Sequence, residues 1–506
     1  MTWREYHEST KHSVESLRRL QHFLDWANMP DPFRHYEGVP VLDLPAHPPI
    51  PEIPALEVLR GAYGATSADD GPAFLSELLF YSAAISASKR VPSTGERYAL
   101  RVNPSSGNLH PTEFHFITRG LNGWPDGLYH YRPSSHMAEQ RARGDFEMKV
   151  AGSFAPIVFI LTSIAWREAW KYRDRAYRYC LHDIGHAWQA LALAARAIGC
   201  DSFAVGRFPD DEVEQFCRLN KDEWPMLIVR LDGKSIPVCD ARAGKADGGE
   251  TGWFGGRANQ LSSEEIAYRL IRDIHSATKP SDGVRSGISA AGQAPTGSGE
   301  IKLPSPVSST RTFGEVVRTR RSALDFQGGM QSMSLAQLSA ILVATAQPFF
   351  ADFASTRFIQ LYLYAHRVDG LKSGVYRFWQ ERAELEQIKS GDQRVAAAGL
   401  SLGQSLAGNA CVAFSMIGDL ELAVHMHGDR GYRYVHFEAG AIGHRLYLAA
   451  EALGLGATGI GAFYDDEVHR YLNLTPEQGQ VVYHFAIGYP VPDPRLSAED
   501  EANEIA

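Results

Sequence analysis

Two apolar stretches of the chain predict helices of nearly the same length and layout. Residues 178–198 and 433–453 carry apolar side chains at helical spacing, and the stretches end at Gly199 and Gly454, where a helix commonly stops. A short apolar run then predicts a buried strand in each place ("SFAV" and "TGIG"), and a second helix begins at an acidic "DDEV". The same order of elements therefore occurs twice.

The two regions align residue by residue. "DRAYRY" at 174–179 returns as "DRGYRY" at 429–434, an offset of 255 that runs without a gap for 40 positions, of which 18 are identical. Upstream, "GLYHY" and "GVYRF" each follow a strand-like alternation, "EFHFITR" and "FIQLYLYAHR". A repeat of roughly 200 residues is the size of a whole domain. We therefore predict an internal duplication.

The segment between the copies predicts the domain boundaries. Residues 279–310 are rich in Gly, Ser, Ala and Pro without an apolar period, which is typical of a linker. Before it, a Ser262 to Glu265 capping-box spacing and a helical apolar pattern predict a closing helix up to 278. We expect a first domain at 1–278 and a second at 311–497. Helices and strands mix without regular βαβ alternation, so we predict an α+β fold.

Composition restricts the setting and the partners. The 506 residues are 44% hydrophobic and 22% charged, with a formal charge of -9, which argues against nucleic acid or an anionic membrane as a partner. Five cysteines lack CxxC spacing, and neither an apolar signal segment nor a run of about 18 apolar residues is present. We expect a cytoplasmic protein.

Common catalytic signatures are missing, and two other segments could carry chemistry. The chain has no GxxxxGK[ST], HExxH or GxSxG motif and no GxGxxG after a strand. Arg320, Arg321 and Ser322 could hold a phosphate through charge-assisted hydrogen bonds, although a solvated basic turn reads the same way. "RVNPSSGNLHPTEF" (101–114) could fold around a flat ring, although an ordinary loop is equally compatible.

Taken together, these motifs resemble the FMN-dependent nitroreductase superfamily. The ordered set is the Arg-Arg-Ser triplet, the "PSSGNLHP" loop and the glycine-containing strand ends "GIGAF" and "AVGRF". "KYRDRAYRY" and the N-terminal "YHESTKHS" resemble its SagB-type azoline dehydrogenase branch in particular. The resemblance implies two tandem domains with an antiparallel-rich mixed sheet flanked by helices. It also implies that the two copies form, within one chain, the dimer that holds FMN at its interface.

The two copies retain different halves of such a site, so we predict a single FMN. The second copy keeps Arg-Arg-Ser and "GIGAF", and the first keeps the "PSSGNLHP" loop. The resemblance implies these cofactor-binding residues: Arg320, Arg321, Ser322 and Arg495 for the phosphate and ribityl chain, Gly461 and Ala462 near N5, and Arg101, Pro104, Ser105, Ser106 and Asn108 from the loop. The counterpart site would combine Lys11, His12 and Ser13 with the degenerate loop from Ala351 to Thr356, and we expect no flavin there.

The residues before the repeated hexapeptide differ between the copies. Lys171 and Tyr172 stand opposite Met426 and His427, and the resemblance implies that a Lys-Tyr pair at this place is catalytic. Aromatising an azoline removes a ring proton and a hydride, and lysine and tyrosine are suited to handling the proton. A surface lysine beside a packed tyrosine is the alternative.

Other polar residues of the repeat suggest structural roles. We expect Arg175 and Arg430 to be structural, with an Asp/Arg pair capping each helix start. His182 and His186 lie four residues apart on a predicted helix, but their counterparts are Phe437 and Ala441. We interpret them as packed histidines and predict no metal site.

Three functions stay open on the sequence. The first is an FMN-dependent dehydrogenase that oxidises a thiazoline- or oxazoline-type ring in a peptide or peptide-like natural product, together with biosynthetic partner enzymes. The second is an NAD(P)H-dependent nitro or quinone reductase. The third is a non-enzymatic flavin-binding or scaffold protein. The substrate, the electron acceptor and any oligomerisation beyond the fused pair are left undetermined.

Overall fold

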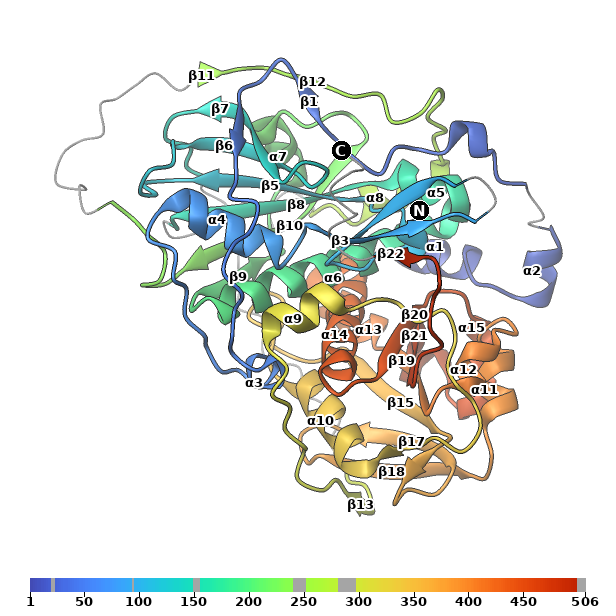
Figure 1. Ribbon diagram of the computed structural model, residues 1–506. Helices are drawn as coiled ribbons and strands as arrows, with labels where there is room; N and C mark the ends of the chain where they lie inside the picture. Colours follow the sequence, from blue (N-terminus) through green and yellow to red (C-terminus); the bar gives the residue numbers. More distant parts are fainter. Residues whose placement is uncertain (20–22, 93–94, 149–154, 240–251, 281–296, 498–506) are drawn as a thin grey trace.

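Two sheets of the same topology form the two halves of the molecule. The computed structural model describes residues 1–19, 23–92, 95–148, 155–239, 252–280 and 297–497. The first sheet has the strand order β11-β7-β6-β5-β8-β10-β9 with β2 also on β7, and the second has the order β13-β18-β17-β15-β19-β21-β20. Strand pairs within both are antiparallel. Figure 1 shows the first sheet in the upper half and the second in the lower half.

Strands occupy the segments that the alternating and apolar patterns predicted, and further strands complete both sheets. Those of the first sheet are β2 (Val41–Asp43), β5 (Thr112–Thr118), β6 (Gly127–Arg132), β7 (Met137–Arg143), β8 (Ile157–Ile164), β9 (Asp201–Val205), β10 (Glu223–Asp232) and β11 (Gly252–Trp253). Those of the second are β13 (Ile301–Lys302), β15 (Ile359–Ala365), β17 (Gly374–Trp379), β18 (Glu384–Ser390), β19 (Val412–Gly418), β20 (Gly456–Ile460) and β21 (Gln480–Gly488). The predicted α+β fold with two tandem units is confirmed.

Small sheets tie distant segments together. They are formed by β1 (Tyr36–Glu37) with β12 (Arg257–Ala258), by β14 (Met333–Ser334) with β16 (Val368–Asp369), and by β22 (Leu496–Ser497), β3 (Ile85–Arg90) and β4 (Arg97–Arg101) in that order. In the last sheet, the end of the second copy pairs with a hairpin of the first.

Helices flank both sheets. They are α1 (Trp3–Ser9), α2 (Val14–Arg19), α3 (Ala55–Leu59), α4 (Gly71–Phe80), α5 (Ala165–Tyr172), α6 (Ala176–Ala197), α7 (Asp210–Cys217), α8 (Arg269–Ala277), α9 (Phe313–Thr319), α10 (Leu335–Ala346), α11 (Arg394–Leu400), α12 (Ser405–Asn409), α13 (Leu420–His427), α14 (Gly431–Ala452) and α15 (Asp465–Leu472). Within the described residues, no helix combines the length and apolarity that crossing a membrane requires.

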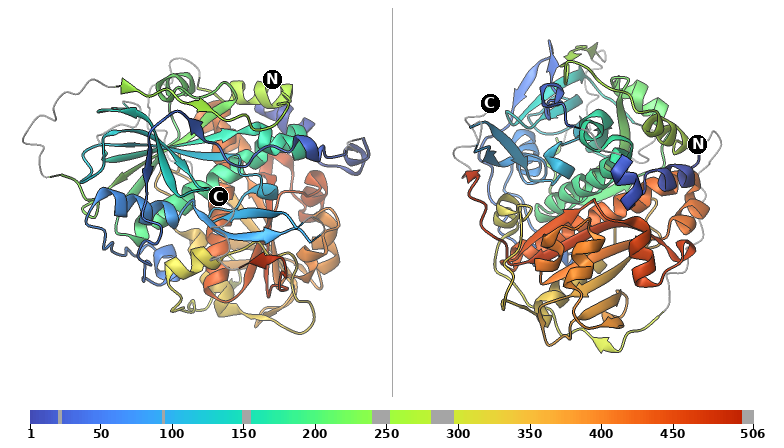
Figure 2. Two further views of the ribbon diagram at one scale, coloured as in Figure 1. Left: turned by 45° about the horizontal axis from the view of Figure 1, so that its top comes forward. Right: turned by 90° about the vertical axis from the view of Figure 1, so that its right-hand side faces the viewer.

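The two long helices predicted from the repeat form the centre of the molecule. α6 and α14 pack on one another between the two sheets, as Figures 1 and 2 show. Both are buried along almost their whole length. The following Gly199 and Gly454 have φ of 83° and 73°, which glycine adopts without steric cost.

Each copy holds the other through a buried ion-pair cluster. Arg175 and Arg178 of the first copy contact Asp465 of the second at 3.1 and 2.9 Å. In the symmetric place, Arg433 of the second copy contacts Asp210 of the first at 2.6 Å. These residues lie in the repeated "DRxYRY" and "DDEV" segments, so each hexapeptide binds the other copy.

This arrangement explains the repeated arginines and corrects their predicted mechanism. Arg430 also contacts Asp210, at 2.5 Å, so Arg175 and Arg430 are structural as expected. However, α6 and α14 begin without a side-chain cap. The ion pairs between the two copies, which are repeated in both clusters, therefore account for these side chains, and helix capping does not.

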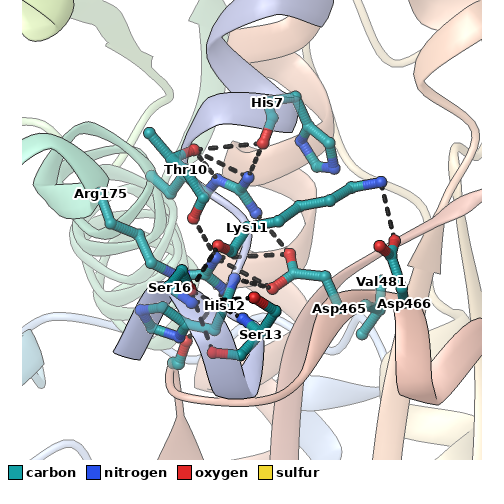
Figure 3. Close-up of polar contacts among 12 residues, drawn as sticks. His7, Thr10, Lys11, His12, Ser13, Ser16, Arg175, Asp465, Asp466 and Val481 are labelled. Carbon is teal, nitrogen blue, oxygen red and sulfur yellow. Dashed lines mark hydrogen bonds and ion pairs between the residues drawn. The ribbon is translucent and has the colours of Figure 1, made fainter. Parts of the chain in front are cut away.

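The N-terminal segment covers one of the two clusters. The backbone N–H of His12 donates to Asp465 at 2.9 Å, and Lys11 Nζ lies 3.0 Å from Asp466. Arg175 also donates to the carbonyl oxygen of Thr10 at 2.6 Å. Figure 3 shows these residues converging on the two aspartates.

The region between the copies differs in part from the prediction. The closing helix α8 begins only at Arg269, and Ser262 Oγ donates to the Glu264 carbonyl instead of capping a helix. Much of the predicted linker, 281–296, lies outside the described residues. Ile301 and Lys302 pair with β18 and so extend the second sheet.

Candidate active site between the two copies

A cavity of about 1140 Å³ lies at the interface of the copies, and both copies line it. It exceeds the range of about 300–1,000 Å³ usual for small-molecule sites. The predicted residues that line it are Arg101, Pro104, Ser105, Ser106, Asn108, Lys171, Tyr172, Arg320, Arg321, Ser322, Gly461 and Ala462. The fold thus brings segments more than 200 positions apart into one site.

Two buried guanidinium groups line this cavity. Arg320 and Arg101 are 3% and 1% exposed. In each, Nε and Nη1 lack a hydrogen-bond partner among the described residues. Burial lowers the pKa of Arg320 and lowers that of Arg101 to about 10. Buried charges without partners are costly, so the pair is suited to an anionic group.

The other predicted phosphate contacts differ in their surroundings. Arg321 donates to the carbonyl oxygens of Arg318 and Ser86. The hydroxyl of Ser322 is hydrogen-bonded to Tyr447 Oη at 2.8 Å. Arg495 is not among the lining residues, and its guanidinium pairs with Asp493 at 2.8 Å. Arg320 and Arg101 therefore provide the more available donors.

The serine loop is fixed from behind by Asp183 of α6. Ser105 Oγ donates to Asp183 at 2.6 Å, and the Ser106 backbone and hydroxyl donate to it at 3.1 and 3.0 Å. Asn108 Nδ2 donates to the Ala99 carbonyl at 2.9 Å. These bonds hold the loop in place, so its position depends on α6.

Lys171 and Tyr172, at the end of α5, reach the same loop. Gly107 has φ of 60°, and a Cβ placed on it would lie 2.6 Å from Tyr172 Oη and 3.2 Å from Lys171 Nζ. Nζ lies 5.2 Å from the centre of the Tyr172 ring. Burial, followed by the charge of Glu168, raises the pKa of Tyr172 well above its usual value. The tyrosine therefore holds its proton at neutral pH.

The glycine-containing strand end approaches the cavity from the second copy. The Gly461 carbonyl accepts a hydrogen bond from Tyr179 Oη at 3.0 Å, and a Cβ on Gly461 would lie 2.4 Å from the Tyr179 ring. The Ala462 carbonyl accepts from Gln404 at 3.2 Å. Only glycine fits between the strand and the ring.

The symmetric position in the other half is filled by the chain itself. Asp352 accepts hydrogen bonds from the backbone N–H groups of Gly206 and Arg207, at 2.8 and 3.1 Å. Phe353 packs so closely that a Cβ on Gly206 would lie 2.6 Å from its ring, and it stacks on Tyr434 at 4.2 Å. Gly206 is the counterpart of Gly461. The degenerate loop therefore covers the counterpart of the cavity.

The predicted other half of that position is wrong. Lys11, His12 and Ser13 lie beside α15, as described above. The Ala55 N–H, at the start of α3, donates to the carbonyl of Arg311, which lies two residues before α9. In the same way the Phe313 N–H, at the start of α9, donates to the carbonyl of Ile53, which lies two residues before α3. These two hydrogen bonds make α3 the counterpart of α9, so the residues after α3 stand opposite Arg-Arg-Ser. Lys11, His12 and Ser13 resemble Arg-Arg-Ser in residue type, but they do not occupy the equivalent position in the first copy.

The paired histidines of α6 pack against aromatic rings. His182 stacks on Tyr483 at 4.4 Å, and His186 Nε2 lies 3.2 Å from Tyr483 Oη. Burial lowers the pKa of His186 to about 3. Both are therefore packed, neutral side chains, as interpreted from the sequence.

Family comparison agrees with this duplicated architecture. The nitroreductase family model matches residues 82–234 and again 317–489. This chain belongs to the nitroreductase family. A crystal structure from Anabaena variabilis, described as a nitroreductase, has a TM-score of 0.75 and 25% identity over 97% of this chain and 99% of its own. The tandem resemblance predicted from the sequence is confirmed, and by family the chain is a nitroreductase-like oxidoreductase.

Curated relatives of this nitroreductase-family chain include a nitroreductase and two proteins named for the processing of trifolitoxin and of microcin B17. A Methanocaldococcus jannaschii protein described as a nitroreductase is 31% identical over 32% of this chain and 83% of its own. The trifolitoxin-processing protein TfxB of Rhizobium leguminosarum bv. trifolii is 26% identical over 43% and 63%. The microcin B17-processing protein McbC of Escherichia coli is 28% identical over 26% and 54%. The matches span less than two thirds of TfxB and of McbC.

Several lining residues were not singled out from the sequence. Asp183, Tyr447 and Tyr483 all line the cavity, but each sits in an apolar helix or strand whose local pattern indicates core. One signal was present for Asp183, because its counterpart at the 255 offset, Glu438, is also acidic. An acidic residue at the same place in two buried helices indicates a required partner.

Proposed function

We propose that this chain is an FMN-dependent dehydrogenase that oxidises a thiazoline- or oxazoline-type ring in a peptide or peptide-derived substrate. The observation that carries the proposal is the placement of Lys171 and Tyr172 in one cavity with Arg101 and Arg320. TfxB, named as a trifolitoxin-processing protein, and McbC, named as a microcin B17-processing protein, support a role in processing a natural product.

The described residues fit FMN at this cavity. The unpartnered nitrogens of Arg320 and Arg101 match a phosphate dianion, which accepts charge-assisted hydrogen bonds. Gly461 and Ala462 would face the ring system, with the serine loop on its other side. FMN, when bound, supplies the hydride acceptor for the reaction. A cavity of about 1140 Å³ also leaves room for a substrate ring.

The chain's own groups would handle the substrate proton. Lys171 Nζ would accept the proton from the ring carbon, and Tyr172 Oη would orient the substrate or pass the proton. Gly107 permits both side chains to approach the loop. The second copy has Met426 and His427 here, and neither lines the cavity, so we assign catalysis to the first copy.

Turnover of an azoline-containing peptide tests the proposal. The flavin-loaded chain is mixed with the peptide and any required partner enzymes, and loss of two mass units is followed by mass spectrometry. Formation of the aromatic azole supports the proposal. Bound flavin that is never reduced by any azoline peptide would contradict it.

A second candidate is an NAD(P)H-dependent nitro or quinone reductase, favoured by the identity to the M. jannaschii protein. Anaerobic mixing with NADPH separates the two. Fast bleaching of the flavin, followed by reoxidation with a quinone or nitro compound, supports the reductase. Slow bleaching with NADPH but fast bleaching with an azoline peptide supports the dehydrogenase.

A further inference from the structure

A buried pair of carboxyl groups lies behind Lys171 and Tyr172. Glu168 of α5 is 0% exposed, and Asp183 of α6 is 2% exposed. Asp183 also lines the cavity. Two acidic groups this deep need either cations or protons to balance them.

Asp183 has hydrogen-bond donors, whereas Glu168 has none in the part of the chain that the structure describes. The donors to Asp183 come from Ser105 and Ser106. Among the described residues, neither carboxylate oxygen of Glu168 has a donor. The carboxyl group that interacts with it is that of Asp183. Two carboxyl groups can bond to one another only if one of them carries a proton.

Burial and like charge favour protonation of the pair. Burial, and then the charge of Asp183, raises the pKa of Glu168 well above its usual value. Burial raises the pKa of Asp183 to about 7, although the bonds from Ser105, Ser106 and Glu168 act in the opposite direction. Two adjacent carboxyl groups cannot readily both ionise.

The other titratable groups that face the pair come from three elements. They are Lys171 and Tyr172 of α5, Cys180 of α6 and Tyr483 of β21. Burial is the main cause that raises the pKa of Tyr172, of Cys180 and of Tyr483. These three stay neutral near pH 7, so they would not compete for a proton that moves between Lys171 and the carboxyl pair.

Comparison with the second copy shows which of the two carboxyl groups is needed to anchor a loop. Glu438, the counterpart of Asp183, accepts the backbone N–H groups of Phe358 and Ile359 at 3.0 and 3.1 Å. An acidic residue that anchors a loop is therefore common to both copies. The counterpart of Glu168, however, is Ala423. Anchoring does not need the second carboxyl, which occurs only in the copy with Lys171 and Tyr172.

We propose that Glu168 and Asp183 share one proton and that the pair receives the proton that Lys171 and Tyr172 remove from the substrate. This inference rests on the proposed function. The substrate C–H bond breaks and its proton goes to the Lys171 amine, while FMN, when bound, would accept the hydride that leaves the neighbouring atom. The Lys171 ammonium then transfers its proton to the Asp183 carboxylate, which gives an amine and a carboxylic acid. Glu168 is a positioning residue, because it acts through Asp183.

Infrared difference spectroscopy of the folded chain tests the shared proton without any turnover. Well above pH 7, the wild type should keep the C=O band of one protonated acid, and Glu168→Gln should lack that band. A second band should appear as the pH falls through about 7, and Asp183→Asn should lack it. Glu438→Gln is the matched control, since it removes the counterpart carboxyl and should leave both bands. Absence of both bands from the wild type would overturn the proposal.

The pH profile of substrate oxidation tests the proton transfer. In the wild type the rate should fall below about pH 7, where Asp183 is already protonated. Asp183→Asn should lower the rate by roughly 10²-fold and lose this limb. Glu168→Gln keeps a hydrogen-bond donor to Asp183, so the fall in rate should stay near pH 7. Glu168→Leu removes the donor that lowers the pKa of Asp183, so the fall should move to higher pH. An unchanged limb in flavin-loaded Asp183→Asn would overturn the transfer. If the bands behave as stated but no azoline is oxidised, the proposed function fails while the shared proton stands.

Discussion

Gly185 and Gly440, which lie 255 positions apart, face one another where α6 and α14 cross. A Cβ on Gly185 would lie 2.9 Å from the Gly440 Cα and 2.2 Å from the Phe437 carbonyl oxygen. A Cβ on Gly440 would lie 2.1 Å from the His182 carbonyl oxygen. The duplicated glycine thus permits the backbone contact on which the two copies are centred.

Gly185→Ala should therefore destabilise the protein. Because the obstructing atoms belong to the backbone, the helices must move apart, and such overpacking costs about 1–3 kcal/mol. Urea unfolding measures the loss. Gly399→Ala in α11 is the control, because a Cβ there meets no atom within 4 Å. Equal stability of the Gly185→Ala protein and the wild type would contradict the close contact.

Lys171→Met should abolish substrate oxidation while leaving flavin bound. Removing the group that accepts the substrate proton lowers such rates by roughly 10²–10⁴-fold. Single-turnover bleaching of the flavin by an azoline peptide gives the rate, and the visible spectrum gives the flavin content. Met426→Ala changes the counterpart residue and should retain the wild-type rate. A flavin-loaded Lys171→Met protein with undiminished rate would refute the assignment of Lys171 as base.

Arg320→Met should weaken FMN binding, because it removes one of the two buried guanidinium groups that line the cavity and have nitrogens without a partner among the described residues. Hydrogen bonds to charged groups contribute about 1.5–3 kcal/mol, equivalent to roughly 10- to 150-fold in Kd. Titration of the apoprotein followed by flavin fluorescence measures the change. Arg495→Ala should bind FMN as the wild type does, since Arg495 pairs with Asp493 outside the cavity. If Arg495→Ala weakened FMN binding more than Arg320→Met did, the result would support the phosphate contact predicted for Arg495 from the sequence.

One FMN should bind per chain. Asp352 and Phe353 cover the strand end that corresponds to Gly461, as the hydrogen bonds to Gly206 and Arg207 show. Comparison of flavin absorbance with protein concentration by amino-acid analysis gives the ratio. A ratio near two would mean that this loop moves aside and would contradict the single-site prediction.

The interface clusters should make stability sensitive to acid. Burial acts to raise the pKa of Asp465, but Arg175 and Arg178 outweigh it and hold the pKa below its usual value. Its stabilising contribution is thus complete above the unfolded-state pKa of about 3.9 and is lost as the pH falls through the lower folded-state value. Asp465→Asn should cost about 3–5 kcal/mol at neutral pH. Urea unfolding from pH 7 to 3 measures both effects.

The neighbouring aspartate provides the control for that experiment. Asp466 is 62% exposed and pairs with Lys11, so Asp466→Asn should change stability by less than about 1 kcal/mol. Its dependence on pH should also match that of the wild type. If Asp466→Asn were as costly as Asp465→Asn, the stabilising contact would lie at the protein surface and not in the buried cluster.

The sequence by itself determined the duplication, the long helices and some of the strands of each copy, and the motif residues that line the cavity. The apolar periodicity of a segment and its likeness to a second segment 255 residues away can both be read along the chain. The long helices, the glycines that end them and the predicted strands could therefore be found without knowledge of the fold. The motifs also named Arg320 and the serine loop in different copies. The local sequence does not show which residues each motif contacts, or how far apart the two motifs lie in the folded chain.

Only the tertiary structure decided which groups meet. Asp183 reaches the serine loop, Arg178 reaches Asp465 in the other copy, and Asp352 covers the counterpart strand end, because two long helices pack with their glycines in contact. In the folded chain, Lys11 and His12 lie beside α15 and not at the counterpart of the cavity. Arg495 is not among the residues that line the cavity. A buried carboxyl such as Glu168 cannot be told from any other helical acid by sequence, because its charge state depends on its burial and on Asp183 of the neighbouring helix.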